Sequence, residues 1–215
     1  MPLRMIRMKS KQKINKSILP IVYISTNLYY MGFSLSQKTD YKNALDEQRL
    51  VVDVLSKLPH KVRYKTYPED NRWYADVDPV LSDVNSADNI ELFSDKVDMR
   101  YLLNESRIIV TACATSTLGW PIMSGHPVVF INQKYKSPLT NGAHASLSRG
   151  IFVFDDDEYD FHEKLRDFLS KTLDEIEDLW HKKKSARKEM IKQYFCSYSS
   201  GAGARASKVI VQEYL

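Results

Sequence analysis

The sequence lacks an apolar run long enough to cross a membrane as a helix, and it lacks closely spaced cysteines. Cys113 and Cys196 fit neither a metal-binding nor a redox spacing, so each is expected to be a free thiol and not half of a disulfide. No apolar segment follows the basic residues at the N-terminus, as a secretion signal would require. These absences predict a cytoplasmic protein.

Three common catalytic or nucleotide-binding motifs are absent as well. The sequence has no Gly-x-Gly-x-x-Gly fingerprint for a dinucleotide, no Gly-x-x-x-x-Gly-Lys-Ser/Thr loop and no Gly-x-Ser-x-Gly elbow. What is present is the composition of a globular chain, with 43% hydrophobic and 27% charged residues over 215 positions. This length suits one domain with a sizeable core, or one half of a two-domain enzyme.

Acidic and aromatic residues are missing from the first seventeen positions, which carry six basic side chains. These are Arg4, Arg7, Lys9, Lys11, Lys13 and Lys16. Such an arm suits an anionic membrane surface or an acidic partner, or it links the chain to a preceding domain. Without interleaved aromatic residues it does not favour nucleic acid. We therefore divide the sequence into a basic arm or interdomain linker at 1–17 and a folded domain at 18–215.

Short β-branched runs alternate with segments of helical periodicity along this domain. Strands are expected at 18–25, 60–67, 90–93, 108–110 and 151–154, and a further strand is expected to end at residue 132. Helices are expected at 40–58 and 98–104, and another is expected to begin near residue 115. This alternation predicts a Rossmann-like α/β sandwich of three layers, with a mostly parallel sheet. A helical C-terminal tail follows from residue 158, broken near 197–201, whereas 69–89 and 134–150 are expected to be mainly loop.

Residues 107–132 combine a buried strand, a turn of small polar residues, a helix start and a second strand. Thr115, Ser116 and Thr117 lie where the helix begins. Free N–H groups and the helix dipole favour an anion at that point, so these hydroxyls suit a phosphate. The same residue types also serve as ordinary helix caps.

Three strand ends are expected to meet at one edge of such a sheet. They carry Ser25, Thr26 and Asn27; Tyr67, Pro68, Glu69 and Asp70; and Thr115, Ser116 and Thr117, with Arg63, Lys65 and Arg72 as nearby cations. Hydroxyls, an aromatic face and positive charge together suit a nucleotide linked to a sugar. For residues 67–71 the alternative is a turn that Pro68 initiates without any ligand.

The remaining chemistry-bearing residues have simpler interpretations. His60, His126 and His144 are expected to be structural, because no orienting partner for acid/base chemistry is evident beside them. The acidic run 155–158 offers oxygen ligands for a divalent cation, but it equally suits the first turn of a helix. The sequence identifies no catalytic residue.

Four segments in order resemble the C-terminal, donor-binding half of GT-B glycosyltransferases that build bacterial surface polysaccharides, including the retaining β-Kdo transferases. They are ISTNLYYMG (24–32), LPHKVRYKTYPEDNRW (58–73), TSTLGWPIMSGHPVVFIN (115–132) and GIFVFDDDEY (150–159). The resemblance implies that residues 115–117 bind the donor phosphate and that residues 67–70 line the nucleotide cleft. It also implies that Ser25 and Thr26 face the cleft, and that an absent N-terminal domain binds the glycan acceptor. GT-B enzymes generally require no metal, so the resemblance leads us to expect neither a metal nor a cofactor.

One departure from the family pattern concerns the ribose. Many GT-B domains place a glutamate shortly after the phosphate-binding hydroxyls, where this sequence has Gly119 and Trp120. Trp120 is then expected to pack in the core. The departure weakens the case for a UDP-sugar and is compatible with a CMP-linked donor.

The leading hypothesis is therefore the donor-binding domain of a glycosyltransferase that transfers a sugar, in the most specific version Kdo from CMP-Kdo, to a lipopolysaccharide or capsular polysaccharide. Two alternatives remain open. One is a non-catalytic α/β module that uses its basic arm on a membrane or an acidic partner. The other is an enzyme similar to sugar-nucleotide epimerases, which would need an acid/base pair inside the cleft.

Overall fold

The computed structural model describes residues 19–25, 40–66, 78–112, 114, 116–196 and 201–214. Its centre is a sheet of strands β1 (Ile21–Ile24), β2 (Val62–Lys65), β3 (Ile90–Phe93), β4 (Ile108–Thr111), β5 (Val128–Asn132) and β6 (Phe152–Asp155). The strand order is β3-β2-β1-β4-β5-β6, and every neighbouring pair is parallel. The predicted parallel sheet is thus confirmed. The order reverses between β1 and β4, where open α/β sheets bind their ligands.

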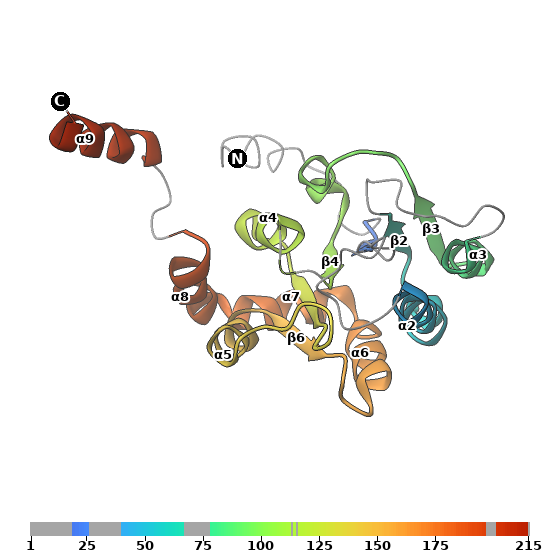
Figure 1. Ribbon diagram of the computed structural model, residues 1–215. Coiled ribbons are helices and arrows are strands. Elements are labelled where there is room, and N and C mark those ends of the chain that lie inside the picture. The colour runs from blue at the N-terminus through green and yellow to red at the C-terminus, as the bar shows by residue number, and fades with distance from the viewer. Residues whose placement is uncertain are drawn as a thin grey trace.

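Helices cover both faces of the sheet (Figure 1). They are α2 (Asp40–Asp53), α3 (Pro79–Ser86), α4 (Ser116–Ser124), α5 (Asn141–Gly150), α6 (Phe161–Leu169), α7 (Leu173–Lys182), α8 (Lys184–Tyr194) and α9 (Ala202–Tyr214), with 3₁₀ turns η2 (Leu55–Lys57), η3 (Met99–Tyr101) and η4 (Leu103–Glu105). α2 contacts both α3 and α6, and α4 contacts η3. The three-layer Rossmann-like prediction is confirmed.

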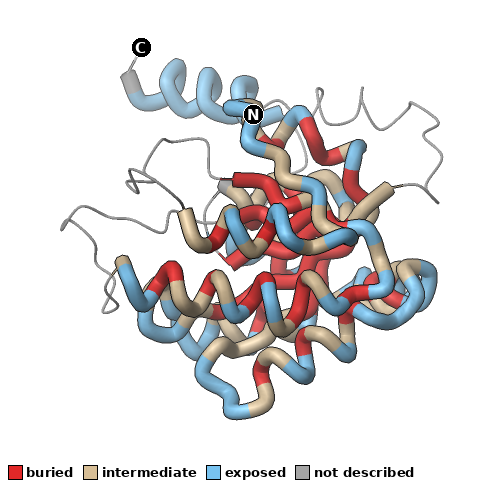
Figure 2. Tube along the Cα trace, turned by 90° about the vertical axis from the view of Figure 1, so that its right-hand side faces the viewer, coloured by how far each residue is buried: buried red, intermediate tan, exposed pale blue. Residues whose placement is uncertain are grey.

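The central strands are buried on both faces, as parallel strands between two helix layers must be. Tyr23 and Val110 belong to the larger core, which includes the inner sides of α2, α3 and α6. Val22, Ile24 and Ile109 pack instead with η3 and η4. Trp120 joins this second cluster, as expected. Figure 2 shows the buried residues gathered along the sheet and the facing helix surfaces.

Two helices lie where the sequence predicted loop. α3 begins at Pro79, and the Asp78 carboxylate caps it by accepting from the N–H groups of Val80 and Leu81 at 2.9 and 3.1 Å. α5 begins after Thr140, whose hydroxyl accepts from the Ala143 N–H at 3.3 Å. The loop prediction was wrong at 79–86 and 141–150 because these short helices owe their stability to neighbours distant in the sequence, α2 for α3 and α8 for α5.

The C-terminal part is helical, as predicted, through α6, α7 and α8. α9 is exposed along its described length and lies apart from the sheet (Figures 1 and 2). Within the described part of the chain, no helix combines the length and apolarity that a membrane span needs.

Candidate functional site

The carboxyl ends of β1 and β4 form the switch point of the sheet. Ser25 directly follows β1 and is buried, and its N–H donates to the Lys65 carbonyl at 2.9 Å. Thr117 lies in the first turn of α4, and the Thr111 hydroxyl donates to its Oγ1 at 3.4 Å. Ser116 is the first residue of α4. The structure therefore brings Ser25, Ser116 and Thr117 to the same edge of the sheet, as the sequence predicted.

Several predicted donor-binding residues fall outside the described part of the chain. These are Thr26, Asn27, Tyr67, Pro68, Glu69, Asp70, Arg72 and Thr115. The basic arm at 1–17 and Cys113 also fall outside it. Their roles stay predictions.

Arg63 and Lys65 lie on β2, beside the switch point, and both have partners within the protein. The Arg63 guanidinium pairs with Glu91 and Glu105, each at 3.0 Å. The Lys65 ammonium is buried and donates to the carbonyls of Thr66 at 3.0 Å and Asp95 at 2.9 Å. Burial lowers the pKa of Lys65, against the opposing effect of nearby carboxylates. Both cations therefore have partners within the protein, and their contact with a donor stays a prediction.

A buried carboxylate that the sequence prediction missed lies beside Ser25. Glu47 of α2 accepts hydrogen bonds from the hydroxyls of Tyr23 at 2.8 Å and Tyr64 at 2.6 Å. The Tyr64 hydroxyl is also 3.0 Å from Ser25 Oγ. Glu47 falls on the apolar stripe that Ala44 and the following helix turns form, and a charge at that position is the signal that identifies it.

Glu47 also lines a pocket between α2 and α6 at the carboxyl edge of the sheet. Its polar lining consists of Asp46, Glu47, Gln133, Asp156 and His162, and its apolar lining of Leu50, Ala112, Ile131 and Phe161. The sequence analysis considered Asp156 only as part of the acidic run 155–158 and assigned none of the lining residues to a donor site, since they come from four separated segments that only the fold brings together. Ala112 directly follows β4, so the pocket adjoins the turn that leads into α4.

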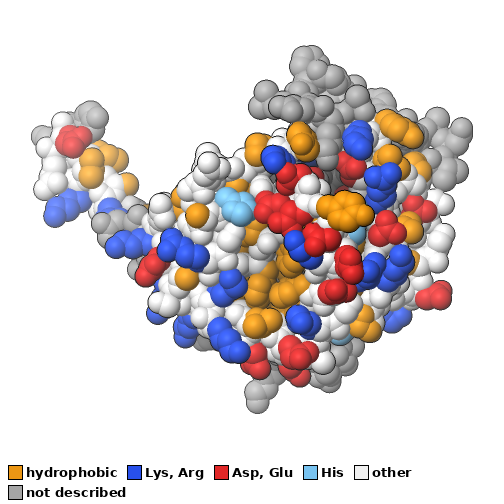
Figure 3. Space-filling model, turned by 90° about the horizontal axis from the view of Figure 1, so that it is seen from below, with side chains coloured by type: hydrophobic (Ala, Val, Ile, Leu, Met, Phe, Trp, Pro, Cys, Tyr) orange, Lys and Arg blue, Asp and Glu red, His pale blue; other side chains and the backbone are white. Residues whose placement is uncertain are grey.

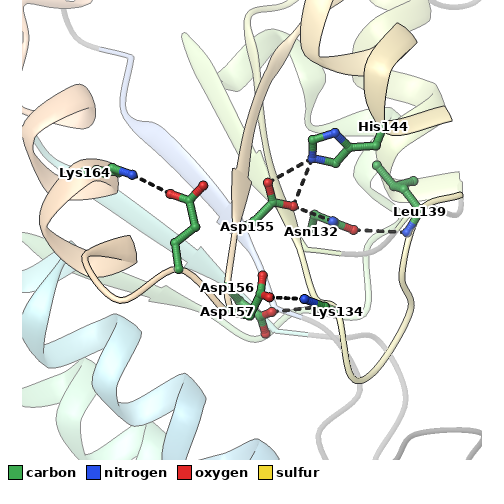
Figure 4. A network of polar contacts seen from close by, with 9 residues as sticks. Asn132, Lys134, Leu139, His144, Asp155, Asp156, Asp157 and Lys164 are labelled. Atoms are coloured by element: carbon green, nitrogen blue, oxygen red, sulfur yellow. Dashed lines mark hydrogen bonds and ion pairs between the residues drawn. The ribbon is translucent and has the colours of Figure 1, made fainter. Parts of the chain in front are cut away.

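The acidic run 155–158, which begins at the last residue of β6, binds the end of β5 and the segment between β5 and α5 (Figure 4). Asp155 Oδ1 accepts from the Asn132 amide at 2.6 Å, and His144 Nε2 lies 2.9 Å from Asp155 Oδ2. Asp156 accepts from the Lys134 N–H at 3.0 Å, and Asp157 pairs with the Lys134 ammonium. His144 therefore has an orienting carboxylate, which the sequence prediction did not anticipate.

The sequence analysis interpreted the acidic run as a cation site or as the first turn of a helix. Neither interpretation includes these hydrogen bonds to Asn132, Lys134 and His144. Figure 3 shows acidic side chains gathered beside a histidine on the face seen from below. Among the described residues, no group of His, Cys, Asp and Glu side chains is arranged to hold a metal ion. Of the other histidines predicted to be structural, His126 has its Nδ1 2.6 Å from Ser124 Oγ, and His60 has its Nε2 2.8 Å from the Lys171 carbonyl.

Burial lowers the pKa of His162 below its ordinary value of 6.5. The folded protein thus favours the neutral ring, and this contribution to stability is complete above the unfolded pKa and is lost as the pH falls below it. We expect the free energy of unfolding to decrease more between about pH 7.5 and 5.5 in the wild-type chain than in His162→Gln, in a range where carboxylates with ordinary pKa values stay ionised. Urea unfolding at both pH values measures the difference. Equal losses in the two proteins would contradict the assignment.

No protein-family model matches the sequence, and no curated protein matches it either. Solved structures do match the fold. Spinosyn forosaminyltransferase SpnP is 17% identical over 90% of this chain and 44% of its own, with a TM-score of 0.53. Anabaena HepE, solved in complex with UDP and glucose, is 9% identical over 99% of this chain and 53% of its own, with a TM-score of 0.53. A Rickettsia africae glycosyltransferase is 14% identical over 99% of this chain and 53% of its own, with a TM-score of 0.51.

These similarities establish the fold. The matched structures include glycosyltransferases, and the chain spans about half the length of each of the three described above. The chain accordingly has the Rossmann-like fold of one half of such an enzyme.

Proposed function

We propose that this chain is the donor-binding half of a glycosyltransferase and that it holds a nucleotide sugar at the carboxyl edge of its sheet. The observation that carries the proposal is the position of the α4 N-terminus at the switch point between β1 and β4. There the Thr111 hydroxyl donates a hydrogen bond to the Thr117 hydroxyl. The free N–H groups of a helix N-terminus attract phosphate, and this edge is where the fold binds ligands.

The whole enzyme would use this half for electrostatic stabilisation. As the bond between sugar and phosphate breaks, negative charge develops on the leaving phosphate, and the α4 N–H groups would stabilise it. A second domain would bind the glycan acceptor, supply the catalytic carboxylate and exclude water on closing. The basic arm would suit contact with an anionic membrane surface. Lipopolysaccharide or capsular polysaccharide is the acceptor class that the sequence resemblance suggests.

Two donor classes compete within this proposal. The sequence resemblance suggests CMP-Kdo, and the replacement of the ribose-binding glutamate by Gly119 and Trp120 agrees with a nucleotide other than UDP. The complex of the Anabaena neighbour with UDP and glucose suggests a UDP-hexose. Both donor classes share a nucleotide phosphate, so titration with the parent nucleotides CMP and UDP bears on each of them.

Calorimetric titration with CMP, UDP and CMP-Kdo tests the proposal directly. At least one is expected to bind, and Thr117→Glu is expected to weaken that binding by about tenfold or more, since it places a carboxylate beside the phosphate. Ser82→Glu is the matched control, because it adds the same charge to the exposed first turn of α3. Failure of all three ligands to bind, or equal effects of the two variants, would overturn the proposal.

A further inference from the structure

The pocket between α2 and α6 lies next to the proposed phosphate position. Ala112 forms part of its wall and directly precedes the turn into α4. A donor whose phosphate lies at the start of α4 therefore brings its neighbouring group to the mouth of this pocket. The cavity measures about 60 Å³, which is room for about four water molecules, or for the hydroxyl groups along one side of a sugar.

The lining of the pocket has one sign of charge. Three carboxylates, those of Asp46, Glu47 and Asp156, face it, and neither Lys nor Arg is among the described residues that line it. Carboxylates accept hydrogen bonds from hydroxyl and ammonium groups and repel another anion. Ile131 and Phe161 add apolar surface of the kind that packs against the C–H face of a sugar. The lining suits a hydroxylated group without negative charge.

The Glu47 carboxylate has a fixed orientation in the pocket, which strengthens the preference for a group without negative charge. Its carboxylate is buried, and the hydroxyls of Tyr23 and Tyr64 hold its two oxygens in place. Asp156 is likewise oriented, because its Oδ1 accepts from the Lys134 N–H at 3.0 Å. Carboxylates held in this way cannot turn away from an anionic ligand, so the repulsion is not relieved by side-chain rotation.

We propose that this pocket receives hydroxyl groups of the donor's sugar and selects a sugar that carries no carboxylate. The inference rests on the proposed function and narrows its donor class to neutral or amino sugars. It counts against Kdo, which is a sugar acid. The nucleotide itself is left open by the pocket.

A matched pair of donors tests the selection. UDP-glucose and UDP-glucuronate differ only by a hydroxymethyl group and a carboxylate at C6, and UDP is the reference for both. We expect UDP-glucose to bind roughly tenfold more tightly than UDP-glucuronate at low ionic strength. If the chain binds only cytidine nucleotides, CMP-Kdo is expected to bind more weakly than CMP.

Conservative variants locate the selection in the pocket. Asp46→Asn and Asp156→Asn each remove one lining charge at constant size and are expected to reduce the discrimination by roughly threefold. Glu163→Gln is the control, because it removes the same charge from an exposed position on α6 that does not line the pocket. Thermal unfolding of each variant checks that the fold is retained.

The outcomes separate this inference from the proposed function. Binding of no nucleotide overturns both. Nucleotide binding with equal or tighter binding of the acidic sugar overturns the inference and leaves the proposed function standing. Discrimination that survives both pocket variants, or that Glu163→Gln also reduces, assigns the selection to another part of the chain and overturns the role of the pocket.

Discussion

Replacement of Trp180 by alanine is expected to lower the free energy of unfolding by about 4 kcal/mol, because a large aromatic side chain is lost from a closed part of the core. Trp180 is 2% exposed, and its Nε1 donates to the Gly125 carbonyl at 3.1 Å. The Arg187 guanidinium lies 3.6 Å from the centre of its ring. The side chain thereby joins α7, α8 and the turn before β5.

Urea unfolding followed by circular dichroism measures the effect. Trp180→Phe retains much of the apolar contact but loses the hydrogen bond to Gly125, so a smaller decrease of about 1–2 kcal/mol is expected. Tyr159→Ala is the control, since this side chain is fully exposed and its removal should change the free energy by less than about 0.5 kcal/mol. A loss below about 1 kcal/mol for Trp180→Ala would show that the C-terminal helices do not share a cooperative core with the sheet.

Glu47→Ala is expected to cost about 2 kcal/mol of stability. The substitution removes the carboxylate that accepts from the buried hydroxyls of Tyr23 and Tyr64, and although Tyr64 keeps Ser25 Oγ at 3.0 Å as a partner, an unsatisfied buried hydroxyl costs about 1–3 kcal/mol. Both tyrosines are fully buried, with ring centres 5.4 Å apart. The cost is one of hydrogen bonding more than of lost apolar contact.

Two variants isolate this cause. Glu47→Gln keeps an oxygen acceptor at the same place and should recover about half of the loss or more. Asp46→Ala removes the adjacent, more exposed carboxylate, and a change below about 1 kcal/mol is expected. Similar losses for Glu47→Ala and Asp46→Ala would contradict the hydrogen-bonding explanation.

The proposed phosphate position and the pocket differ in how far the sequence predicts them. The start of α4 follows directly from the sequence, as a strand, a turn of small residues and a helix in succession. The pocket does not, because α2 and α6 are separated by five strands and three α-helices in the described chain. If both predictions about the pocket and the phosphate hold, the donor is recognised partly by a local motif and partly by a tertiary one.

The carboxylates after β6 illustrate why local interpretation was incomplete. An acidic run before a helix suggests capping or a cation, and both interpretations consider only its neighbours in the sequence. In the structure, Asp155 binds Asn132 and His144 instead, and Asp156 binds the backbone of Lys134. Parallel pairing of β5 with β6 brings these residues together. A partner across a strand pair cannot be identified from the periodicity of either strand.

The sequence by itself determined the class of fold, the buried strands and the polar switch-point edge, because these depend on hydrophobic periodicity and turn chemistry within short segments. Only the tertiary structure decided that residues 79–86 and 141–150 are helical. It also decided that Lys65 is buried among carbonyls and that Glu47 faces two tyrosines and a pocket. The physical reason is common to these cases. The free energy of a short helix or a buried charge comes from groups far away in the sequence, and those contacts exist only once the sheet has assembled.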